Sequence, residues 1–180
     1  MNAREKILKA ADKFFGTKSF SEVSIAPILQ EADVQAPTLY YHFGDKEGLY
    51  VCWLDSTASG MRAQLGIRSD TSLEDGLAAF ASIYFVAAKF DYGQILRDMP
   101  SLAKEETKES AYGAYFKAVY EPLCAILIGG MERGELPAEP VGRLADIFLA
   151  GLFALHPTVE KDPAGVAAWY AKRFLRGHLA

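Results

Sequence analysis

Side chains that form strong hydrogen bonds are concentrated in one short stretch of this sequence. They are Gln35, Thr38, Tyr40, Tyr41, His42 and Lys46. Amide, hydroxyl, imidazole and ammonium groups of this kind bind phosphate oxygens and the edges of nucleic-acid bases. The stretch therefore has the composition of a surface that recognises another molecule through hydrogen bonds.

Two short helices joined by a tight turn are predicted to position these side chains. Ser24 is a good N-cap for a helix over about 25–32. Asp33 can adopt the left-handed conformation that a tight turn often needs, and residues 35–37 open a second helix that ends near Phe43. This pattern predicts a helix-turn-helix, in which the second helix enters the DNA major groove.

Two kinds of DNA contact are expected from this motif. Gln35 can both donate to and accept from adenine, and the Thr38 hydroxyl can bond a base or a phosphate. The groups expected to bond phosphate oxygens are Ser24, Tyr40, Tyr41, His42 and Lys46. Helix periodicity leaves His42 and one of the two tyrosines open as structural residues, whereas Leu39 and Phe43 are expected in the core.

The remainder of the chain is also predicted to be helical. Apolar stripes at helical spacing predict helices over about 3–16, 46–66, 73–90, 92–99, 103–134, 140–155 and 164–177. Pro122 is expected to kink the helix that contains it. The predicted fold class is therefore all-α, with a three-helix DNA-binding domain at residues 1–46 and a larger ligand-binding and dimerisation domain at residues 47–180.

Composition and charge restrict the class of protein. Hydrophobic residues make up 51% and charged residues 23% of the chain, as in a globular protein. Cys52 and Cys124 form no CxxC motif, and the N-terminus lacks the apolar core of a signal peptide, so a cytoplasmic location with reduced thiols is expected. The net charge is −4, and residues 1–50 hold six basic against seven acidic residues, or −1. This balance opposes DNA binding unless the basic residues gather on one face.

The segment over residues 7–49 resembles the N-terminal domain of the TetR family of bacterial transcriptional regulators. Its most specific part is T-L-Y-Y-H-F-G-D-K-E-G-L, at Thr38–Leu49. The resemblance implies a homodimer that binds a palindromic operator and is released by a small ligand. It also places Ala36 at the DNA, although the family often has a basic residue there and at Gly44.

The body of such a protein would hold the ligand and the dimer interface. The bulky residues expected to line an apolar or aromatic ligand are Trp53, Met61, Phe80, Tyr84, Met99, Tyr112, Tyr115, Phe116 and Tyr120. The resemblance points to the last two helices as the dimer interface, where the apolar stripe comprises Leu144, Phe148, Leu152, Leu155, Trp169, Tyr170 and Phe174. Either set could equally be the core of a monomer.

An enzyme is not expected. The sequence has no GxSxG, HExxH, P-loop or GxGxxG motif, and its three histidines are scattered, so neither a cofactor nor a metal site is predicted. The alternative function is a helical small-molecule-binding or interaction protein with weak or no DNA binding. A scaffold that uses the helix-turn-helix to bind protein is a third possibility, and the sequence does not separate a repressor from an activator.

Overall fold

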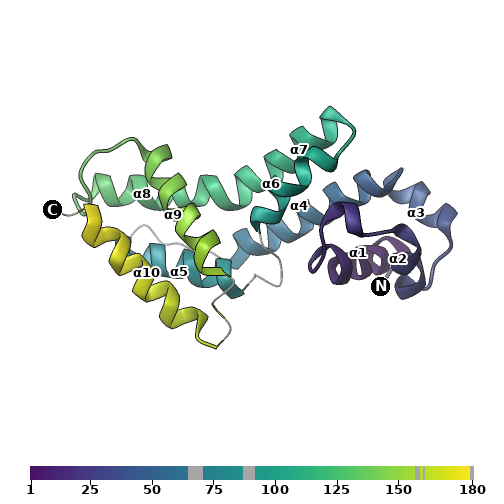
Figure 1. Ribbon diagram of the computed structural model, residues 1–180, viewed down its shortest axis with the longest axis horizontal. Helices are drawn as coiled ribbons and strands as arrows, with labels where there is room; N and C mark the ends of the chain where they lie inside the picture. The colour runs from purple at the N-terminus through teal and green to yellow at the C-terminus, as the bar shows by residue number, and fades with distance from the viewer. Residues whose placement is uncertain (65–70, 87–91, 157–158, 160, 179–180) are drawn as a thin grey trace. The chain divides into compact units, whose positions relative to one another are not determined.

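The computed structural model describes residues 1–64, 71–86, 92–156, 159 and 161–178 (Figure 1). Every regular element in these ranges is helical, which confirms the predicted fold class. The α-helices are α1 (Ala3–Phe15), α2 (Ile25–Ala32), α3 (Ala36–Phe43), α4 (Lys46–Gln64), α5 (Leu73–Val86), α6 (Tyr92–Asp98), α7 (Glu105–Tyr115), α8 (Glu121–Glu132), α9 (Val141–Leu155) and α10 (Pro163–His178). None of the described helices is long and apolar enough to cross a membrane.

Short turns of other helix types lie between some of these elements. They are the 3₁₀ turns Phe20–Glu22 and Met99–Ser101 and the π-helical turn Phe116–Tyr120. The continuous helix predicted over 103–134 is instead α7 and α8, separated by the π turn just before Pro122. Proline has no N–H to continue the backbone ladder, so it is accommodated in the first turn of a new helix.

Two compact units make up the chain. The first contains α1–α3, α4 as far as Ser59, α6 and α7; the second contains the end of α4 with α5, α8, α9 and α10. The first unit thus extends past residue 46, because α6 and α7 pack with the first half of α4. The functional boundary at residue 46 stays a prediction.

An aromatic cluster forms the centre of the first unit. The ring of Phe15 lies 5.1 Å from that of Tyr50 and 5.4 Å from that of Trp53, and Phe20 lies 5.0 Å from Tyr50. The indole Nε1 of Trp53 donates to the Asp12 carboxylate at 3.0 Å. Phe15 belongs to α1 and Trp53 to α4, so the cluster packs the start of α4 against α1.

Phe148 of α9 occupies the centre of the second unit. Its ring lies 6.3 Å from Phe80, 5.0 Å from Phe174 and 4.9 Å from Tyr170. The Tyr170 hydroxyl donates to the carbonyl of Phe148 at 2.9 Å, and a Cβ at Gly151 would lie 2.0 Å from that hydroxyl oxygen. The glycine therefore allows α9 and α10 to pack closely within one chain.

Candidate nucleic-acid interface

The turn between α2 and α3 has the geometry expected from the sequence. Asp33 ends α2 with φ 52° and ψ 55°, in the left-handed region. Its N–H donates to the carbonyl of Gln30 at 3.3 Å, and the Val34 N–H donates to that of Leu29 at 3.2 Å. Aspartate tolerates this conformation better than most residues, so the turn forms without a glycine.

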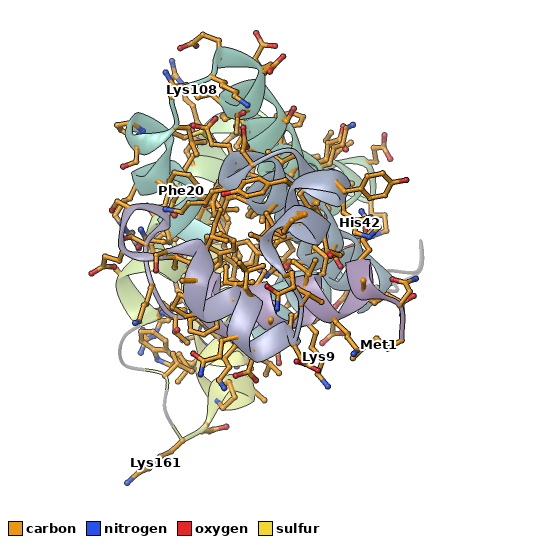
Figure 2. All side chains as sticks on the ribbon, turned by 90° about the vertical axis from the view of Figure 1, so that its right-hand side faces the viewer. Met1, Lys9, Phe20, His42, Lys108 and Lys161 are labelled. Atoms are coloured by element: carbon orange, nitrogen blue, oxygen red, sulfur yellow. The ribbon has the colours of Figure 1, made fainter. Side chains whose placement is uncertain are left out.

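The side chains of α3 divide into a buried and an exposed face. Leu39 and Phe43 are buried, as expected, and pack α3 into the core of the first unit. Tyr40 is 50% exposed and Tyr41 85% exposed, and His42 also lies at the surface (Figure 2). Two exposed aromatic rings on so short a helix are costly in water, which indicates a surface that another molecule covers.

The two helix N-termini of the motif also have free polar groups. Ser24 and Gln35 are the N-cap residues of α2 and α3, and neither side chain makes a capping hydrogen bond. Both are exposed, whereas Ala36 and Thr38 in the first turn of α3 are half-buried. A serine hydroxyl and helix N-terminal N–H groups together favour a phosphate, and a free amide favours a base edge.

Intramolecular bonds engage nearly all the acidic residues that give residues 1–50 their negative charge. The engaged carboxylates are those of Glu5, Asp12, Glu22, Glu31, Asp45 and Glu47. For example, the ammonium of Lys13 lies 2.8 Å from the carboxylate of Glu31, and hydrogen bonds from the side chain and backbone of Ser19 lower the pKa of Glu22. Residues 34–44 contain no acidic residue at all, so the negative charge lies away from the exposed face of α3.

Two cations of the first unit rest on aromatic rings. The ammonium nitrogen of Lys46 lies 4.1 Å from the centre of the Phe20 ring, and the guanidinium carbon of Arg4 lies 5.6 Å from that of Phe43. Burial lowers the pKa of Lys46, and the nearby Asp98 carboxylate opposes this effect. Sequence reasoning identified Lys46 but not Arg4, because contact between residues 4 and 43 depends on how α1 and α3 pack.

A buried carboxylate of α6 is hydrogen-bonded to a residue near the start of α4. Asp98 of α6 is 2% exposed and accepts hydrogen bonds from the Tyr50 hydroxyl at 3.0 Å and from Nε2 of Gln94 at 2.8 Å. Burial, together with the charge and hydrogen bond of Asp98, raises the pKa of Tyr50 far above its usual range. The phenol therefore stays protonated and remains a donor.

A second link joins the start of α4 to that of α7. The Glu47 carboxylate accepts from the N–H of Ala103 at 2.7 Å and of Lys104 at 3.3 Å. The ammonium of Lys104 pairs with Asp45 at 2.5 Å. Asp45 also accepts from the Gly48 N–H at 2.9 Å and thereby caps α4. Nothing in the local sequence indicated the partners Ala103 and Lys104 just before α7, which lie more than fifty residues away.

The residues expected to line a ligand site occur in both units. Trp53 belongs to the aromatic cluster of the first unit, where Met99 is half-buried and the rings of Tyr112 and Tyr115 lie 6.4 Å apart. In the second unit, Phe80 and Tyr84 are fully buried, and the rings of Phe116 and Tyr120 stack at 5.2 Å. The side chain of Met61 lies outside the described residues. This site stays a prediction.

The residues expected at the dimer interface have two different environments. Leu144, Phe148 and Leu152 are at most 1% exposed in the single chain, and Phe174 is also buried, so they have almost no surface to offer a partner. They are residues of the core in the single chain, and the dimer interface stays a prediction. Tyr170 and Leu155 are half-buried. Trp169 is 52% exposed and is the member of the set with a large free apolar surface.

Comparison with known proteins gives one consistent result. Residues 7–51 match the model of bacterial regulatory proteins of the tetR family. The chain is 26% identical over 133 residues, 67% of its own length and 70% of the relative's, to the HTH-type transcriptional regulator LmrA of Bacillus subtilis.

Solved structures of regulators have the same fold over nearly the whole chain. The structure of FadR from Bacillus subtilis in complex with stearoyl-CoA aligns with a TM-score of 0.77 at 15% identity, over 96% of this chain and 98% of that one. PfmR from Thermus thermophilus aligns with a TM-score of 0.69 at 23% identity, over 94% and 97%. The matched segment contains α2, the turn and α3 as described above. Residues 7–51 of the chain thus match the model of the tetR family of bacterial regulatory proteins, and the chain as a whole shares the fold of these solved regulators.

Proposed function

We propose that this chain is a homodimeric repressor that binds a palindromic operator in the cytoplasm and releases it when an apolar or aromatic ligand binds. The observation that carries this proposal is the exposed face of α3. It presents Gln35, Thr38, Tyr40 and Tyr41 with no carboxylate between residues 34 and 44. Such a face complements a DNA groove, in which every acceptor-rich base edge is flanked by phosphates.

Dimerisation is required because one short helix contacts few bases. Two copies of the motif would read half-sites about 34–36 Å apart, or a multiple of that distance. The exposed apolar positions on the described parts of α9 and α10 include Ile147, Ala150, Ala154 and Trp169. The Tyr170 hydroxyl lies 3.3 Å from the carbonyl of Ile147, which brings α10 beside this part of α9. Small alanines beside two large apolar side chains favour close helix packing across a twofold axis.

The ligand class follows from the buried aromatic residues and from one structural relative. FadR of Bacillus subtilis was solved with stearoyl-CoA, whose acyl chain is a long apolar group. In this chain, aromatic side chains such as Phe80 and Tyr84 provide apolar walls of the kind that bind such groups. A ligand that binds the DNA-incompetent conformation more tightly than the competent one would shift the population toward release.

The test is a binding titration of the purified dimer with its own upstream promoter DNA and with a scrambled duplex, at several salt concentrations. A preference for the promoter fragment is expected, together with release on addition of stearoyl-CoA or of an aromatic ligand. Tyr40→Ala and Thr38→Ala should each weaken operator binding by about tenfold, because each removes a hydroxyl that bonds charged phosphate or a base.

Tyr112→Ala is the matched control, since Tyr112 on α7 is 53% exposed and Tyr40 is 50% exposed. Its operator affinity should equal that of the wild type. Light scattering after size exclusion should show that all three variants remain dimers. If the wild type does not distinguish the promoter from scrambled DNA even at low salt, the chain is a helical binding protein and the repressor proposal fails.

A further inference from the structure

Arg4 lies in the first turn of α1, next to the last residue of α3. Its guanidinium carbon is 5.6 Å from the centre of the Phe43 ring. The turn that holds Arg4 is fixed by a capping box, in which the Glu5 N–H donates to the Asn2 side chain at 2.9 Å and the Asn2 N–H donates to Glu5 at 3.0 Å. A basic group is therefore held at the C-terminal end of α3.

The charge of Arg4 is available to a further partner. Its side chain is exposed, and no acidic residue in the described part of the chain forms an ion pair with it. The neighbouring Glu5 carboxylate is taken up by Asn2, whose Nδ2 also donates to it at 3.1 Å. A guanidinium that stacks on a ring through its flat face keeps its N–H edge free for an acceptor.

The exposed face of α3 needs cations from outside the helix. Between Ala36 and Phe43 there is no lysine or arginine, yet phosphate neutralisation usually supplies much of the affinity for DNA. Lys46 lies over Phe20, and Arg4 lies over Phe43. Arg4 is thus a cation from outside α3 whose guanidinium lies beside the last residue of that helix.

We propose that Arg4 is a phosphate-binding residue of the DNA interface. Its guanidinium, which lies over the Phe43 ring, donates to a phosphate oxygen beside the C-terminal end of α3. The inference rests on the proposed operator binding. It assigns part of the affinity to α1, outside the two helices of the motif.

The test is the salt dependence of DNA binding by Arg4→Ala. The affinity should fall about tenfold at roughly 0.1 M salt, by the same factor for operator and unrelated duplex, because a phosphate contact carries no sequence information. The slope of log affinity against log salt should become shallower by about 0.9, the value for one phosphate. Arg4→Lys keeps the charge and should keep the wild-type slope.

Lys9→Ala is the matched control, since Lys9 is an exposed cation on the same helix and projects away from His42 (Figure 2). It should leave the slope unchanged. Arg4→Gln keeps a planar group over Phe43 and should match Arg4→Ala, which shows that charge rather than packing is responsible. Circular dichroism melts of all variants without DNA establish that they are folded.

Two results would overturn the inference: an unchanged slope in both Arg4→Ala and Arg4→Gln, or an equal change of slope in Arg4→Ala and Lys9→Ala. The second would mean that only net charge matters. Both leave operator preference intact in the wild type. A wild type without that preference would instead be a failure of the proposed function, so the two failures are distinguishable.

Discussion

Tyr50 and Asp98 form the most deeply buried polar pair of the first unit. A carboxylate taken out of water is costly unless donors replace its hydration, and Asp98 has two such donors, Tyr50 and Gln94. Tyr50 belongs to the helix that follows α3, and Asp98 ends α6. The pair therefore links α6 to α4, the helix that directly follows α3.

Removal of the Tyr50 hydroxyl should leave this carboxylate short of one donor. Tyr50→Phe is expected to lower the free energy of unfolding by about 1–3 kcal/mol, the range for a buried polar group that loses its partner. Urea unfolding at neutral pH measures the effect. Tyr41→Phe is the control, because Tyr41 is 85% exposed and its hydroxyl is in water. Equal stability of the two variants would show that the Tyr50–Asp98 bond contributes nothing.

At the scale of elements, a carboxylate at the start of α4 caps the N-terminus of α7, a helix that is distant in the sequence. Glu47 accepts the free N–H groups of Ala103 and Lys104 before α7, where a helix N-terminus favours negative charge. Asp45 binds the Lys104 ammonium and also caps its own helix. The segment at the start of α4 is thus joined to the segment before α7 through two carboxylates.

Both carboxyl groups have a lowered pKa in the folded chain. For Glu47, burial raises the pKa, but the hydrogen bonds from Ala103, Thr107 and Lys104 outweigh it. For Asp45, the hydrogen bond from Lys104 has the largest effect, followed by that from the Gly48 N–H. A lowered folded-state pKa stabilises the fold above the unfolded-state value and is lost as the pH falls through the folded-state value.

Glu47→Gln should therefore lose stability at pH 7 and approach the wild type as the pH falls through the lowered folded-state pKa of Glu47, where the wild-type carboxyl group becomes protonated. Urea unfolding at a series of pH values from neutrality down through that pKa gives the two curves. Glu109→Gln on the exposed side of α7 is the control and should follow the wild-type curve. A constant offset between Glu47→Gln and the wild type at every pH would contradict the assignment.

At the scale of the whole molecule, α9 and α10 leave an apolar surface at which the proposed second copy would bind. The side chains of Leu144, Phe148 and Leu152, which were expected at the interface, are buried by contacts within the chain. Ile147 is 53% exposed and Trp169 52% exposed, and they remain as the large apolar groups on these two helices. A twofold dimer would bury both sets at once, since each copy contributes the same surface.

Ile147→Glu and Trp169→Glu should each convert the dimer to a monomer at micromolar concentration, because a charge would be buried without a partner. Size exclusion with light scattering measures the mass, and operator binding should fall with it. Ile128→Glu on α8 is the control: Ile128 is 42% exposed, so the same charge is introduced at a comparable apolar site. A dimer that survives both substitutions would place the interface elsewhere.

The sequence by itself determined the helical character of the chain and most of its helices, although it predicted one continuous helix where a π turn separates α7 from α8. The capping box at Asn2, the left-handed turn at Asp33 and the cap at Asp45 depend on neighbours within a few residues, so local patterns were sufficient. The same is true of the buried pair Leu39 and Phe43, which helical spacing places on one face of α3.

Only the tertiary structure decided which face of each helix is buried against other helices and which face is exposed. Periodicity shows that α9 has an apolar stripe, but Phe148 became core and Ile147 surface because α10 packs on one side of that helix and not the other. Two contacts join residues that are about forty or more positions apart: the hydrogen bond between Tyr50 and Asp98, and the contact of the Arg4 guanidinium with the Phe43 ring. Such contacts depend on how whole helices pack, and no local pattern encodes that arrangement.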